Sequence, residues 1–171
     1  MVIGAMIVPR IFKHLRLPLD SKMKYVQKLV RLHLRPISLT KEEISDSAVR
    51  RLLFDAGDDI DDLITLCRAD ITSKNDRKVN RILKNYERVE LLLKEVEEKD
   101  RLRNWQPPVS GEQIMYIFNI PPGKNVGILK ASIRESILEG EIPNEKEAAL
   151  SFLLKKGNDL GLTADRDKFQ A

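Results

Sequence analysis

Apolar residues recur at helical spacing along almost the whole chain. The longest run, residues 75–100, keeps one continuous apolar stripe and places charged residues on the other faces. We find no segment with the strict alternation of a half-buried strand. The pattern predicts an all-α protein, with helices over residues 48–56, 75–100, 110–118, 124–138 and 144–157. Three further helices are predicted from sets of apolar residues that share a face: Ile7, Ile11 and Leu15; Tyr25, Leu29 and Leu32; and Ile60, Leu63, Ile64, Cys67 and Ile71.

Capping and breaking residues mark the expected helix ends. Asp20 or Ser21 can cap the second helix, and Arg35-Pro36 should end it, because the residue before a proline avoids helical angles. Capping boxes are predicted at residues 40–43 and 110–113, and Asn144 is expected to cap the last helix. Gly140 can end its helix in a left-handed conformation.

The helical pattern stops at Asn-Trp-Gln-Pro-Pro, residues 104–108, which predicts an extended segment between helices and contains the single tryptophan. We therefore expect a helical bundle over residues 1–103, a proline-rich linker over residues 104–109 and a small helical domain over residues 110–171. A chain of 171 residues is long enough for two such cores.

Charge is placed unevenly along this chain, whose formal net charge is +4. Up to Ile37 the only acidic residue is Asp20, whereas acids predominate between Lys41 and Asp62. A basic face beside an acidic one suits a polyanionic partner approached from one side. An ordinary solvated surface with internal ion pairs is the alternative. Aromatic residues make up only 5%, which argues against a platform for stacking many bases.

A single cysteine and a short apolar start bear on compartment. Cys67 excludes an internal disulfide and lies in an apolar helical context, so we expect a buried, inert thiol in a reducing compartment. The apolar residues 1–8 are too few to span a bilayer, and no signal-peptide pattern accompanies them. We therefore expect a cytoplasmic protein with no membrane contact.

Two segments carry candidate chemistry. His33 and Asp70 each lie on a helical stretch, as the metal ligands of a helical phosphohydrolase do, but the chain has only two histidines. We expect an incomplete, unoccupied remnant of a metal site and no hydrolase activity; a purely structural role for His33 is the alternative. The acids of residues 58–62 are explained by a helix start, where negative charge is favourable.

The second segment is a glycine-flanked helix start. Gly123 and Gly127 surround Lys124, and exposed backbone amides at such a start can hold a phosphate. Lys130 and Arg134 follow at helical spacing and would extend the basic track. The alternative is a structural turn in which Gly127 permits close helix packing.

Five segments, taken in order, resemble a known family: VRLHLRP (30–36), VRRLLF (49–54), TLCRADI (65–71), PPVSGEQIM (107–115) and PGKNVGIL (122–129). They are similar to the rear half of bacterial tRNA nucleotidyltransferases, the CCA-adding enzymes and related poly(A) polymerases, in the form with a histidine–aspartate domain. The resemblance runs from about residue 1 to residue 161. It implies the rear part of a histidine–aspartate-type helical domain followed by a helical tail.

The resemblance also implies a function. In that family an N-terminal head carries paired carboxylates, Mg²⁺ and the ATP or CTP site, and the helical parts behind it hold tRNA. This chain has no match to the head motifs, so we expect a tRNA-binding portion with no catalytic residues and no cofactor of its own, whose partners are tRNA and the missing head. The residues expected to contact RNA are Lys124, Lys130, Arg134, Arg101 and Arg103.

Two other functions stay open. The chain could be the remnant of a metal-dependent phosphohydrolase of the histidine–aspartate type, or a helical interaction module. The apolar residues Val2, Ile3 and Ile7 are expected to be exposed and to favour homo-oligomers.

Overall fold

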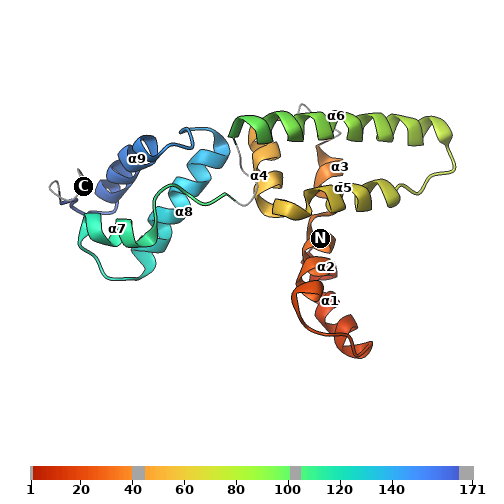
Figure 1. Cartoon of the computed structure of the whole chain (residues 1–171), viewed down its shortest axis with the longest axis horizontal. Helices are drawn as coiled ribbons and strands as arrows, with labels where there is room; N and C mark the ends of the chain where they lie inside the picture. Colours follow the sequence, from red (N-terminus) through yellow and green to blue (C-terminus); the bar gives the residue numbers. More distant parts are fainter. Residues whose placement is uncertain (1, 40–44, 101–104, 166–171) are drawn as a thin grey trace. The chain divides into compact units, whose positions relative to one another are not determined.

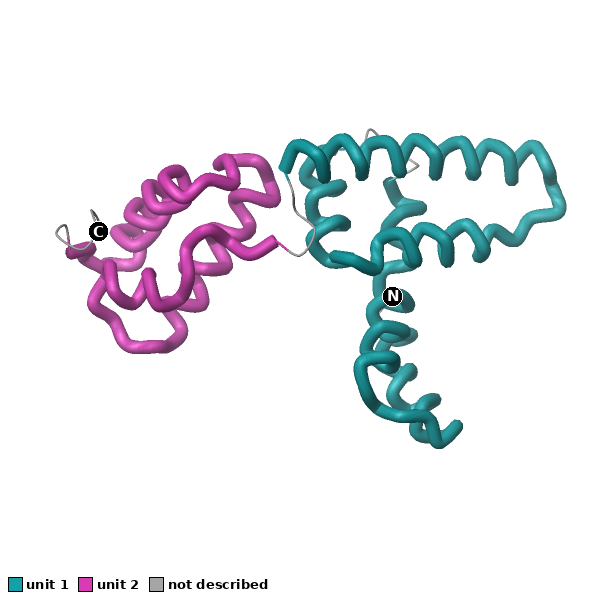
Figure 2. Tube along the Cα trace, viewed as in Figure 1, with its two compact units in different colours: residues 1–104 teal, residues 105–171 magenta. Residues whose placement is uncertain are grey.

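In a computed structural model, which describes residues 2–39, 45–100 and 105–165, all regular structure is helical (Figure 1). The predicted all-α class is confirmed. The chain divides into two compact units, Met1–Asn104 and Trp105–Ala171, coloured separately in Figure 2. Each unit has its own core and is described by itself.

The first unit is a helical bundle preceded by a hairpin. Helix α1 packs against α2, and α4 packs against α6. The bundle core consists of fully buried side chains from four helices: Leu32, Val49, Leu52, Leu53, Leu63, Tyr86 and Val89. The elements are α1 (Val2–His14), α2 (Ser21–Leu32), α3 (Arg35–Ser38), α4 (Asp46–Ala56), the 3₁₀ turn η1 (Gly57–Asp59), α5 (Ile60–Ala69) and α6 (Asp76–Asp100).

Helix α1 buries only a narrow strip. Ala5 and Val8 are buried, and the Ala5 carbonyl accepts a hydrogen bond from Gln27 Nε2 of α2 at 2.8 Å. The opposite stripe is solvent-exposed and apolar, with Ile3 exposed to 73% and Ile7 to 44%. The prediction of apolar exposure is confirmed for these two residues, and the side chain of Val2 lies outside the described part.

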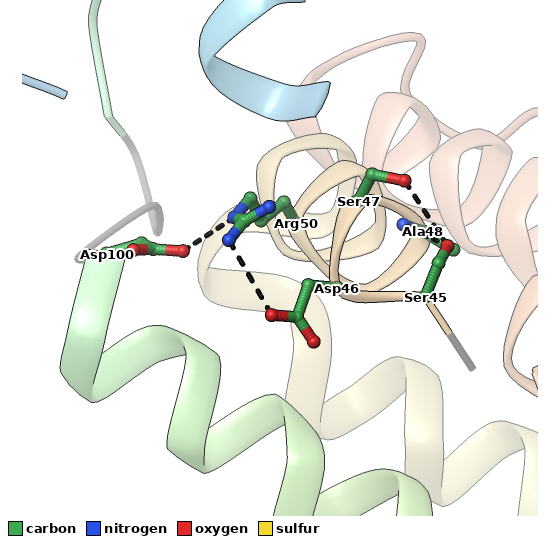
Figure 3. Close-up of polar contacts among 6 residues, drawn as sticks. All are labelled: Ser45, Asp46, Ser47, Ala48, Arg50 and Asp100. Carbon is green, nitrogen blue, oxygen red and sulfur yellow. Dashed lines mark hydrogen bonds and ion pairs between the residues drawn. The ribbon is translucent and has the colours of Figure 1, made fainter. Parts of the chain in front are cut away.

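A partly buried arginine joins α4 to α6 (Figure 3). Arg50 donates from Nε to Asp100 Oδ2 at 2.6 Å, and its Nη2 lies 3.7 Å from Asp46 Oδ2. Only 12% of the Arg50 side chain is exposed. Asp100 ends α6, where the helix dipole disfavours a carboxylate, and the guanidinium compensates for that charge. Ser45 caps the start of α4 by accepting a hydrogen bond from the backbone of Ala48.

Of two predicted helix ends in this unit, one is confirmed and the other is wrong. Asp20 caps α2 as predicted, accepting from the Lys22 amide at 2.9 Å. Arg35 and Pro36 do not end that helix: α2 stops at Leu32, and Pro36 stands in the first turn of the short α3. Proline suits this position because the first helical amides need no intrahelical acceptor. The capping box predicted at residues 40–43 lies outside the described residues.

The second unit contains α7 (Gly111–Phe118), α8 (Lys124–Glu139) and α9 (Lys146–Asp159). The predicted capping box is confirmed: Ser110 Oγ accepts from the Gln113 amide at 3.2 Å, and Gln113 Oε1 accepts from the Ser110 amide at 2.9 Å. Gly140 ends α8 with φ of 78°, also as predicted. The core of this unit is made of Val109, Ile114, Ile117, Phe118, Leu129, Ile133, Ile137, Ala149 and Leu153.

Helix α9 corrects the prediction for its first residues. Asn144 does not cap it: Glu145 holds that position without a side-chain hydrogen bond, and Asn144 Oδ1 accepts from Trp105 Nε1 at 2.7 Å. The helix ends at Asp159, close to the end predicted near Gly157, and Gly157 is buried within it. The side chain that would have capped the helix instead accepts a hydrogen bond from a residue 39 positions away in the chain.

Candidate functional site

The three cations predicted on α8 do not form one track. Lys124 opens the helix and Lys130 is exposed. Lys130 and Arg134, four residues apart, share a face, whereas Lys124 lies about a third of a turn away. Arg134 is engaged by a neighbour, with Nη2 at 3.0 Å from Glu135 Oε1. Lys124 and Lys130 are therefore the better placed of the three for an anionic partner.

The start of α8 retains the features that favour an anion. Its N-cap is Gly123, no side chain caps it, and no acidic residue stands in its first turn. The dipole of this helix is therefore not compensated locally. A Cβ placed on Gly127 would meet nothing within 4 Å, so close helix packing does not explain that glycine.

The near-equal numbers of basic and acidic residues in the second unit limit its attraction for an anionic partner. Residues 105–171 hold eight Lys or Arg against nine Asp or Glu. Lys130 also faces acid: the pKa of Glu112 is lowered, first by a hydrogen bond from Ser110 and in smaller part by the charge of Lys130. Arg101 and Arg103 lie outside the described residues. Contacts from α8 would be local ones, without a broad basic surface around them.

The other predicted pair, His33 and Asp70, lines one cavity of about 530 Å³ in the first unit. His33 follows α2 and Asp70 follows α5, so the ends of two helices bring them to the same space. His33 Nδ1 lies 2.6 Å from the Val30 carbonyl, which can only accept, so Nδ1 carries the proton. Its Nε2 is then the ring nitrogen left for other partners.

Two cations of α6 also line this cavity, and no sequence motif marks them. Lys78 and Arg81 stand three residues apart, and Asn85 follows four residues later on the same face. Within the described ranges, no group of three or more His, Cys, Asp or Glu side chains could hold a metal ion. The incomplete metal site at His33 and Asp70 stays a prediction. The cations of Lys78 and Arg81 and the amide of Asn85 could engage a phosphoryl anion, while the Asp70 carboxylate lines the same cavity.

Cys67 lies beside this cavity and is buried, as predicted. Its Sγ donates to the His33 carbonyl at 2.9 Å, which ties α5 to the end of α2. Burial raises the pKa of Cys67 to about 11, and burial likewise raises the pKa of the neighbouring Tyr86 to about 12. Both groups are neutral at pH 7 and serve the packing of the bundle.

We expect the Cys67 thiol to react slowly in the folded chain. A rise of its pKa from 9.0 to about 11 lowers the thiolate fraction at pH 8 by roughly 100-fold, before any steric protection. Alkylation by iodoacetamide in buffer and in urea, followed by mass spectrometry, measures this difference. Equal rates in the two conditions would contradict it. Because the folded chain holds this proton more tightly, the free energy of unfolding should also fall between about pH 9 and about pH 11.

Two results place these sites in context. In the part of the chain that the structure covers, no helix has the length and apolar character required to cross a bilayer. Comparison of the chain with models of known protein families, with curated proteins and with solved structures finds no match.

Proposed function

We propose that this chain is the C-terminal, tRNA-binding portion of a tRNA nucleotidyltransferase, acting in the addition or maturation of the tRNA 3′-CCA end. The ordered resemblance of the five segments between residues 30 and 129 carries this proposal. An all-helical chain with two separate cores suits the body and tail of such an enzyme. The nucleotidyl transfer itself, with Mg²⁺ and ATP or CTP, belongs to a head for which this sequence has no matching motif.

The physical task of such a portion is to hold folded RNA by its shape. An A-form stem hides its base edges in a deep groove and offers phosphates and 2′-hydroxyls. Lysines and arginines on rigid helices can contact these groups with few aromatic residues. Lys124 and Lys130 are the α8 residues proposed for this contact, and both are exposed.

The test is filter binding of the chain to tRNA that lacks its CCA end, compared with a DNA duplex of equal charge, at low and moderate salt. We expect a preference for tRNA that weakens steeply with salt, since each phosphate contact contributes about 0.7–0.9 to the salt slope. The double variant Lys124→Gln, Lys130→Gln should lower that slope, and Lys155→Gln, on the exposed surface of α9, serves as the control. Equal, weak binding to both nucleic acids would contradict the proposal, as would incorporation of nucleotides by the chain alone.

One observation favours a second candidate function, a remnant of a phosphohydrolase. His33 and Asp70 share their cavity with Lys78 and Arg81, so a phosphoester could lie among them. Hydrolysis of a 2′,3′-cyclic phosphodiester with added divalent metal, lost in His33→Asn, would support it. No turnover with any of Mg²⁺, Mn²⁺ or Ni²⁺ would exclude that activity.

The third candidate, an interaction module, rests on the exposed apolar stripe of α1, in which Ile3, Ile7 and Ile11 follow one another at intervals of four residues. The occupant that we propose is a second copy of the chain. Sedimentation of the free chain over a range of concentrations tests it. A monomer at all concentrations would exclude it.

A further inference from the structure

The α1–α2 hairpin concentrates the positive charge of this protein. Residues 2–32 contain seven Lys or Arg and one acidic residue, a formal charge of +6, whereas the whole chain carries +4. Lys28 forms an ion pair with Asp59 at 2.7 Å. The other six cations make no ion pair with any residue that the structure describes: Arg10, Lys13, Arg16, Lys22, Lys24 and Arg31.

Four arginines outside the hairpin have carboxylate partners. Arg35 pairs with Asp55, and Arg68 Nη2 lies 3.0 Å from Glu90 Oε2. Arg50 and Arg134 likewise have carboxylate partners, described above. The hairpin therefore differs from these parts of the protein in two ways: its net charge is positive, and most of its cations have no carboxylate partner among the described residues. Both properties are expected of a surface that binds a polyanion.

Four of these cations gather around the turn between α1 and α2. The chain turns after α1 through hydrogen bonds from the Leu17 amide to the Phe12 carbonyl, at 2.8 Å, and from the Arg16 amide to the Lys13 carbonyl, at 3.2 Å. Arg16 stands at the left-handed position of this turn, with φ of 54°. Glycine or asparagine normally occupies that position. A long cationic side chain is thus held there in spite of the local backbone preference.

The start of α2 also departs from helix rules. Lys22 and Lys24 stand in its first turn, which has no acidic residue, and only the N-cap Asp20 is negative. Cations at this end add to the positive end of the helix dipole, where acids are the stabilising choice. Two independent departures from local stability rules, at Arg16 and at the α2 start, therefore raise the positive potential at one turn.

We propose that this basic turn, formed by Lys13, Arg16, Lys22 and Lys24, is a surface that contacts the phosphate backbone of folded RNA. The inference rests on the proposed function and locates RNA contacts on the first unit, in addition to α8. The hairpin is the segment at the red end of the colour range in Figure 1, where α1 and α2 lie side by side. All four side chains are exposed.

The chemistry of the basic turn favours phosphate over bases or lipid. Residues 13–24 include no Phe, Tyr or Trp, and His14 is the one aromatic ring among them, so a platform that stacks several bases is not formed there. Surfaces that enter a lipid interface usually include tryptophan or phenylalanine among their apolar residues. The exposed Leu15, Leu17 and Leu19 nevertheless accompany the cations, and binding to anionic lipid is therefore the competing outcome to be measured.

The experiment compares charge-neutralised variants of the full chain in filter binding to tRNA lacking its CCA end. The double variant Lys22→Gln, Lys24→Gln removes two cations from the basic turn. Arg16→Gly removes a third and suits the left-handed backbone, so loss of binding in it cannot be attributed to unfolding. The matched control is Lys94→Gln, Lys99→Gln, which removes two exposed cations from the acid-rich end of α6. Circular dichroism verifies the helix content of each variant.

We expect the double variant to bind tRNA about tenfold more weakly at moderate salt and to lower the salt slope by about 1.4–1.8, with the control within twofold of the unmodified chain. If the unmodified chain shows no preference for tRNA over the equal-charge duplex, the proposed function and this inference both fall. If it prefers tRNA but the basic-turn variants match the control, only this inference falls. Only this inference falls, too, if the basic-turn variants bind less to vesicles of phosphatidylcholine and phosphatidylserine while their tRNA binding is unchanged.

Discussion

Replacement of Gly157 by alanine should destabilise the second unit by about 1–3 kcal/mol. A Cβ at this position of α9 would lie 2.2 Å from Cζ and 2.3 Å from Cε1 of Phe118, whose ring is buried in the core of the unit. Alanine is otherwise the better helix former by about 1 kcal/mol, so steric overlap has to outweigh that gain. The result would show that α9 needs a glycine to approach α7 closely.

Gly127→Ala is the matched control within the same unit. Gly127 lies in α8 with open space where a Cβ would be, and alanine there should stabilise the helix by about 0.5–1 kcal/mol. Urea unfolding followed by the fluorescence of Trp105, the single tryptophan, reports on this unit because that ring packs against its core. Stabilisation in both variants would show that Phe118 can move aside.

Arg50→Ala should destabilise the first unit by about 2–4 kcal/mol, because it leaves the carboxylate of Asp100 without its partner. Only 20% of the Asp100 side chain is exposed, and its Oδ2 lies 2.6 Å from Arg50 Nε. The change also removes the link between α4 and the end of α6 (Figure 3). Urea unfolding followed by circular dichroism measures it.

Arg68→Ala is the control for an exposed pair. Arg68 and Glu90 are 39% and 34% exposed, and solvent screens such a pair, so its loss should cost less than about 1 kcal/mol. A cost for Arg50→Ala no larger than that for Arg68→Ala would contradict a structural role for the link between α4 and α6.

Local signals explain what could be predicted from the sequence. The capping box at Ser110, the cap at Asp20 and the left-handed Gly140 each depend on residues within a few positions, so their outcome follows from the spacing alone. The apolar stripe of residues 75–100 likewise predicted α6, although its side chains are fully buried only from Tyr86 onward. The packing of α6 against its neighbours decides which part of the apolar stripe is buried.

Tertiary contacts explain what could not be predicted. The side chain of Asn144 binds Trp105 and leaves the start of α9 uncapped, and Gly157 is matched to Phe118 through contacts that periodicity does not encode. For the candidate sites, the sequence assigned His33 and Asp70 to one incomplete metal site, and only the folded arrangement shows that Lys78 and Arg81 line the same cavity. Which cations are left without a carboxylate is also a property of the folded chain.

The protected state of Cys67 makes this protein a suitable background for site-directed labelling. A cysteine introduced at an exposed position such as Lys84 would be accessible, so a maleimide dye would attach there while the buried thiol remains unmodified. The single tryptophan, Trp105, can then donate excitation energy to a dye on the other unit. The native chain thus provides, without removal of any residue, one optical donor and one addressable acceptor position for measuring how tRNA changes the distance between the two units.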